Sequence, residues 1–84
     1  MKVKDLIQQL STLNPEREIV IQLDSDGNGY SPCSDIWVGL YQPITKQYGE
    51  ASLEELTAED REFGYMEEDI LSEGTKAVFL CPLV

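Results

Sequence analysis

The first part of the chain carries apolar residues at the spacing of a helix. Between residues 3 and 13 they recur every three or four positions, at Val3, Leu6, Ile7, Leu10 and Leu13. This spacing places them on one face and predicts an amphipathic helix of about three turns. The residue before a proline is disfavoured in the helical region, so we expect the helix to end at Asn14-Pro15.

Three later segments have the pattern of β-strands. Residues 18–23 (EIVIQL) include three consecutive β-branched residues, which favours a strand that could be covered on both faces. Residues 35–41 predict a second strand, ended by Pro43, and residues 76–81 predict a closing strand, ended by Pro82. In the second strand, alternation places Ile36, Val38 and Leu40 on one face and Trp37, Gly39 and Tyr41 on the other.

The segment before the closing strand has a helix signal. Ser52 is followed three residues later by Glu55, which is the capping-box pattern and predicts a helix running to about Arg61. Leu53 and Leu56 would be the core contacts of this helix.

The order of these elements predicts the fold class. The 84 residues suffice for one domain, spanning residues 1–84. Hydrophobic residues make up 42% of the chain, which is typical of a globular domain and not of a disordered one. We expect an α+β fold with a small, mostly antiparallel sheet of about three strands, packed on the N-terminal helix and carrying an acidic, partly helical insert before the last strand.

Charge is the strongest compositional feature. Six basic and sixteen acidic residues give a net charge of −10, which argues against direct binding to nucleic acid or to an anionic membrane. Ten of the acidic residues and a single arginine lie in residues 50–73, here called the acidic segment, so this segment alone carries a net −9. Its candidate contact residues are Glu50, Glu54, Glu55, Glu59, Asp60, Glu62, Glu67, Glu68 and Asp69.

The acidic segment has two interpretations. It is either a solvated face that keeps a small protein soluble, or a surface that imitates the phosphates of DNA and binds a basic protein. In the second case exposed aromatic residues such as Tyr48, Phe63 and Tyr65 would contribute to the interface. Trp37 and Tyr41 likewise either stack on a ligand or simply cover the sheet.

Residues 24–35 (DSDGNGYSPCSD) match the template of a calcium-binding loop. Calcium prefers six to eight oxygen ligands, and the candidates are Asp24, Asp26, Asn28, the Tyr30 carbonyl and Asp35. However, a strand and not a helix precedes the loop, and its twelfth position is Asp where the template has Glu. The alternative is a turn between two strands, stabilised by its own Asp and Asn side chains.

The sequence offers little for catalysis. It contains no histidine, neither cysteine has an evident activating partner, and no glycine-rich phosphate loop precedes a helix. We therefore expect a protein that is not an enzyme and has no cofactor, apart from calcium if the loop binds it. Residues 1–5 lack the apolar segment of a signal peptide, so we expect a cytoplasmic protein in which Cys33 and Cys81 are free thiols.

Several short motifs occur together in one order. They are VKDLIQQL at residues 3–10, LNPEREIVI at 13–21, DGNGYSP at 26–32, DI at 35–36 and VFLCP at 78–82. This pattern resembles a group of short acidic proteins encoded by bacteriophages and prophages, over about half of the chain. Members of that group often have Trp before the closing Pro, where this chain has Cys81. The resemblance implies an origin in the cytoplasm of a bacterial host and transfers no activity or site residue.

These observations together predict a phage or prophage accessory protein. It would bind a basic or nucleic-acid-binding host protein through the acidic segment, as a nucleic-acid mimic or as an inhibitor of host defence. The alternative is a calcium-binding module that uses residues 24–35. An exposed edge strand would also allow two copies to pair as a homodimer.

Overall fold

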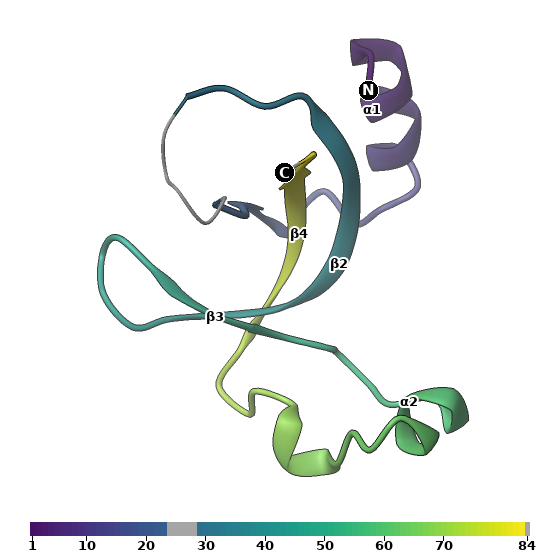
Figure 1. Cartoon of the computed structure of the whole chain (residues 1–84), viewed down its shortest axis with the longest axis vertical. Coiled ribbons are helices and arrows are strands. Elements are labelled where there is room, and N and C mark those ends of the chain that lie inside the picture. Colours follow the sequence, from purple (N-terminus) through teal and green to yellow (C-terminus); the bar gives the residue numbers. More distant parts are fainter. Residues whose placement is uncertain (24–28, 84) are drawn as a thin grey trace.

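A computed structural model describes residues 1–23 and 29–83 of the chain. It confirms the α+β class, with two α-helices, one 3₁₀ helix and four strands in the described part (Figure 1). In chain order the elements are α1 (Val3–Leu10), β1 (Glu18–Ile21), β2 (Cys33–Pro43), β3 (Gly49–Ser52), α2 (Ala58–Glu62), the 3₁₀ helix η1 (Glu67–Asp69) and β4 (Thr75–Pro82).

The four strands form one mixed sheet in the order β1-β4-β2-β3. β2 pairs antiparallel with both β3 and β4, whereas β1 pairs parallel with β4. β4 lies between two strands and is covered on both faces, so it supplies the buried core residues of the described part: Ala77, Val78 and Phe79 are at most 3% exposed. The sequence predicted one strand fewer, because β3 lies in the region interpreted as the start of the acidic insert.

The sequence indicated that the first strand could be covered on both faces, and the structure of β1 differs from this expectation. It ends at Ile21 and not at residue 23, and it forms an edge of the sheet. Ile19 and Ile21, which project from one face of this strand, are 54% and 68% exposed, so that face is not covered. β2 and β4 are both slightly longer than the predicted strands, and Pro43 and Pro82 are their last residues.

α1 is shorter than the predicted helix. Its first turn is capped by Asp5, whose carboxylate accepts the backbone N–H of Lys2 at 3.0 Å. Its side chains are not fully buried: Leu6 and Leu10 are half-buried, while Val3 and Ile7 stay exposed. The helix lies beside one end of β2 (Figure 1). Within the described part of the chain, no helix has the length and hydrophobicity needed to span a bilayer.

The capping box of the acidic segment forms five residues later than predicted. The Thr57 hydroxyl accepts the N–H of Asp60 at 3.1 Å, and the Asp60 carboxylate accepts the N–H of Thr57 at 2.9 Å. Ser52 does not cap a helix. It ends β3, and its hydroxyl accepts the backbone N–H of Leu71 at 3.0 Å, which fastens the return of the chain toward β4.

Candidate protein-binding surface

One face of the sheet is aromatic. The register places Trp37 of β2 opposite Phe79 of β4, and their rings stack with centroids 4.0 Å apart and planes 12° apart. Gly39 makes room for this arrangement, since a Cβ atom there would lie 2.5 Å from the Trp37 ring. Trp37 therefore packs on the sheet through Phe79, and its indole N–H donates to Gln22 Oε1 at 3.3 Å.

The aromatic face contains a groove, and β2, one of the strands that line it, curves strongly along its length (Figure 1). The cavity is about 650 Å³, here called the aromatic groove. Residues 20–23 of β1 and the chain after it form one wall, and Tyr41 and Tyr48 of the β2–β3 hairpin form the other. Trp37 and Phe79 lie between the two walls. The sequence indicated Trp37 and Tyr41 as a possible ligand surface and Tyr48 as an interface residue of the acidic segment, but it did not indicate Phe79 or the β1 wall, which only the sheet brings together with them.

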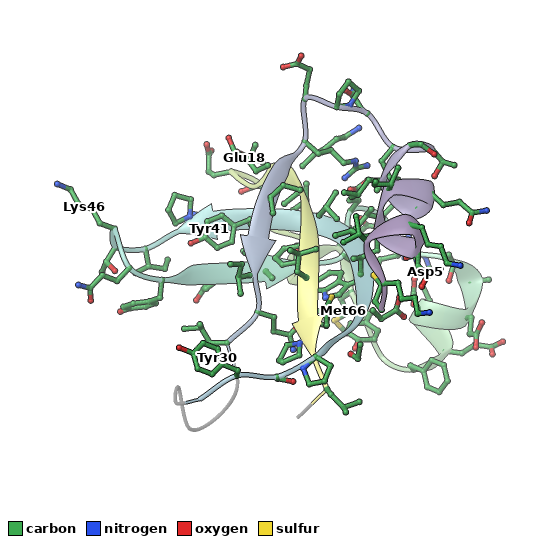
Figure 2. The ribbon with its side chains drawn as sticks, turned by 90° about the horizontal axis from the view of Figure 1, so that it is seen from above. Asp5, Glu18, Tyr30, Tyr41, Lys46 and Met66 are labelled. Carbon is green, nitrogen blue, oxygen red and sulfur yellow. The ribbon has the colours of Figure 1, made fainter. Side chains whose placement is uncertain are left out.

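The hairpin wall depends on a second close approach. Gly49 of β3 lies under the Tyr41 ring, where an added Cβ atom would come within 2.6 Å of the phenol oxygen. Glycine therefore allows Tyr41 to lie flat against the neighbouring strand. In Figure 2 Tyr41 lies beside β1, while Lys46 is at the far tip of the hairpin.

A smaller cavity lies beside the aromatic groove and is lined by residues of the acidic segment. It is about 260 Å³ and shares Trp37 and Ala51 with the groove. Its other lining residues include Leu56, Tyr65 and Asp69, which belong to the acidic segment. The two cavities are therefore neighbours at Trp37 and Ala51, and the acidic segment lines part of both.

Glu54 has a structural role that the sequence did not reveal. Both of its carboxylate oxygens accept hydrogen bonds from the Arg17 guanidinium, which also donates to the Ala77 carbonyl at 3.3 Å. The side chains are only 14% (Arg17) and 23% (Glu54) exposed. The hydrogen bonds from Arg17 hold the pKa of Glu54 below its ordinary value. Glu54 belongs to an internal ion pair, so it is not an available contact residue, contrary to the prediction.

Three other predicted contact residues are also engaged. Asp60 caps α2, and the Asp69 carboxylate accepts the backbone N–H of Met66 at 2.7 Å. Glu67 forms an exposed ion pair with Arg61. These carboxylates order the two short helices and contribute less free charge to a partner.

The remaining carboxylates point to solvent. Five of the predicted contact residues are exposed, and their carboxylates form no hydrogen bond or ion pair with any described residue. They are Glu50, Glu55, Glu59, Glu62 and Glu68. We call them the free carboxylates. Between Glu62 and Glu68 lies an apolar tip, residues 63–66, in which Phe63 and Met66 are 75% and 59% exposed. Gly64, with φ of +98°, reverses the chain there after α2.

The calcium prediction falls mostly outside the described residues, since Asp24, Asp26 and Asn28 are not among them. Of the other candidate ligands, Tyr30 is fully exposed and Asp35 accepts the N–H of Ile36 at 2.8 Å through its carboxylate. In residues 1–23 and 29–83 no group of three acidic or cysteine side chains is arranged to hold a metal ion.

Both cysteines are free thiols. Cys81 lies next to the groove, and its Sγ donates to Gln22 Oε1 at 3.4 Å. Burial raises the pKa of the Cys81 thiol, which lowers the thiolate fraction at neutral pH and hence its reactivity as a nucleophile.

Comparison with known proteins adds no relative. No family model matches the chain, and neither the curated proteins nor the solved structures include a significant match.

Proposed function

We propose that this protein is a non-enzymatic binding protein that captures a basic protein through its acidic segment. The observation that carries this proposal is the apolar tip at residues 63–66, exposed among free carboxylates. A solvated face that served solubility alone would not need a large exposed aromatic residue at its centre. Apolar and aromatic side chains surrounded by charge are instead typical of the anchor and rim of an interface.

The charge of the segment specifies the class of partner. Glu55, Glu59 and Glu62 lie within one stretch of eight residues that includes α2, and the one cation there, Arg61, is paired with Glu67. A cluster of negative charges attracts a basic surface on a partner and accelerates the association of the two proteins. This attraction weakens as the salt concentration rises. A nucleic-acid-binding protein has such a surface, so mimicry of DNA remains part of the proposal.

The resemblance to phage-encoded proteins suggests that the partner should be sought in a bacterial host. We propose a host protein in the bacterial cytoplasm, on which the acidic segment would act as an inhibitor. Duplex DNA should compete for the same partner surface if the acidic segment imitates phosphates, and should not compete otherwise.

The proposal is tested by capture from a bacterial lysate with matched charge variants. Glu55→Lys/Glu62→Lys reverses two free carboxylates, and Gln8→Lys/Gln9→Lys adds the same number of lysines at exposed positions of α1, outside the acidic segment and away from β1. We expect the wild-type protein and the control to retain the same basic protein, and the Glu55/Glu62 variant to bind it about tenfold or more weakly, as loss of complementary charges predicts. Equal capture by both variants, or capture insensitive to salt, would refute the proposal.

A further inference from the structure

β1 presents an open backbone edge. Gln22, just after the strand, donates its N–H to the Leu80 carbonyl of β4 at 3.0 Å. Successive residues of a strand direct their backbone groups to opposite edges. The N–H and C=O groups of Val20 therefore face β4, and those of Ile19 and Ile21 face outward, where no described strand pairs with them. Such an edge is a template for another strand.

The aromatic groove runs along this edge. Its β1 wall consists of consecutive residues 20–23, which point alternately to the two faces, so the groove borders the edge of the strand and not one face alone. A second cavity of about 530 Å³ shares Val20, Ile21, Tyr41 and Gln47 with the groove and extends it to Glu18. In Figure 2 Glu18 marks one end of β1 and Tyr41 lies beside the strand.

We propose that an extended, basic segment of the partner binds in the aromatic groove as an additional strand, hydrogen-bonded to the outer edge of β1. This inference rests on the proposed function, because the same partner meets the acidic segment. The smaller cavity beside the groove shares Trp37 with it and is also lined by Tyr65 of the acidic segment, so we expect one partner chain to contact both.

The lining of the groove favours basic side chains on the face of the added partner strand that points into the groove. Among the described residues, no lysine or arginine lines either cavity, and Glu18 lies at one end. The aromatic faces of Trp37, Tyr41 and Tyr48 attract cationic side chains. On the opposite face of the sheet, Ile19 and Ile21 are more than half exposed. The bound segment would therefore alternate basic residues toward the groove with apolar residues over these two isoleucines.

A second copy of this chain fits the edge less well. Pairing β1 with β1 would bring together two molecules that each carry a net charge of −10, with Glu16 and Glu18 beside the contact. Sedimentation of the protein alone tests this alternative. A dimer that Ile21→Pro converts to a monomer would show that the edge serves self-association and would overturn the proposal.

The test uses Trp37 as an intrinsic probe, since it is the only tryptophan of the chain and lines the groove. The probe peptide is acetyl-Lys-Val-Lys-Val-Lys-Val-Lys-amide, and acetyl-Lys-Gly-Lys-Pro-Lys-Gly-Lys-amide is a control of equal charge that forms strands poorly. We expect the first peptide to change the Trp37 fluorescence with saturation, and the second to bind at least tenfold more weakly, as loss of strand pairing predicts.

Two pairs of variants locate the contact. Ile21→Pro removes an outward N–H and leaves the bonds to β4, so we expect about tenfold weaker binding, whereas Ile21→Thr keeps the N–H and should bind nearly as the wild type. If Ile21→Pro does not fold, judged by circular dichroism, the second pair decides. Gln47→Lys adds a cation at the exposed lip of the groove and should weaken binding, while Gln47→Glu should not.

The outcomes separate this inference from the proposed function. If both peptides bind equally, lose affinity in Glu55→Lys/Glu62→Lys and leave Trp37 unchanged, the acidic segment binds cations and strand addition is wrong. If neither peptide changes the Trp37 fluorescence, strand addition is also wrong, whatever the lysate experiment shows. If the Val peptide binds and only the edge and lip variants weaken it, strand addition holds while the role of the acidic segment is refuted.

Discussion

The ion pair between Arg17 and Glu54 makes the sharpest stability prediction. It joins the chain before β1 to the chain after β3, across 37 residues of sequence, and the guanidinium also binds the β4 backbone. Replacing Glu54 with Gln leaves a half-buried cation without its charge partner. Loss of a charged hydrogen-bond partner at such a site costs about 1.5–3 kcal/mol of unfolding free energy. In a domain of this size each kcal/mol corresponds to a melting shift of about 4–8 °C.

The matched control is the other ion pair of the described residues, Arg61–Glu67. Its side chains are 56% and 68% exposed, so Glu67→Gln should cost less than about 1 kcal/mol. Urea unfolding of both variants at pH 7 gives the comparison. If Glu54→Gln and Glu67→Gln lose the same free energy, burial does not strengthen the Arg17 pair and the reasoning is wrong.

The pH dependence provides an independent check. The folded protein holds the pKa of Glu54 below its ordinary value of 4.5, so the unfolded state takes up this proton first as pH falls. The stabilisation is therefore fully present above the ordinary value and is lost as pH falls through the lowered folded pKa. The free-energy difference between wild type and Glu54→Gln should be constant from pH 6 to 8 on this basis, and should shrink below about pH 4.5. A difference that stayed constant at low pH would contradict the assignment.

Three further predictions concern the core, the groove and the loop. Phe79→Ala removes a 3% exposed ring that stacks on Trp37 and should cost about 3–5 kcal/mol, which a urea melt would detect as an unfolded or barely folded protein. Gly39→Ala places a Cβ atom 2.5 Å from both the Trp37 ring and the Ser52 carbonyl, so we expect a loss of about 1–3 kcal/mol and a changed Trp37 emission. If residues 24–35 bind calcium, the ion at about 100 times its dissociation constant should stabilise the protein by about 2.7 kcal/mol in a thermal melt against chelator. Asp24→Ala should remove that shift, and the absence of a shift would leave the loop as a turn.

Local patterns in the sequence predicted the first helix and three of the four strands, because these patterns depend on neighbouring residues. The apolar spacing located α1, and the alternation in β2 correctly separated the face of Trp37 from the face of Val38. The start of α2 was missed because two positions fit a capping box equally well. Ser52 is used elsewhere, as the acceptor for Leu71 N–H, and this contact between residues 19 positions apart is not visible in the local pattern.

The candidate site depended more on long-range pairing and was predicted less well. The parallel pairing of β1 with β4 joins the beginning and end of the chain, and the sequence carries no register signal for it. That pairing makes β1 an edge and brings residues 20–23 opposite Tyr48 across the groove. The aromatic residues could be identified one by one, but the groove that they form together could not.

The acidic segment illustrates why a count of charges does not define a surface. Glu54 and Asp60 stabilise the fold. A partner that bound either carboxylate would first have to break the ion pair with Arg17 or the N-terminal cap of α2. The free carboxylates form no such contacts with the described residues, so a basic partner can neutralise them while the ion pair and the cap stay intact. Substitutions at Glu55 and Glu62 should therefore change binding and leave unfolding nearly unaltered, whereas Glu54→Gln should change unfolding first. This separation allows the same set of variants to distinguish residues that stabilise the fold from residues that contact a partner.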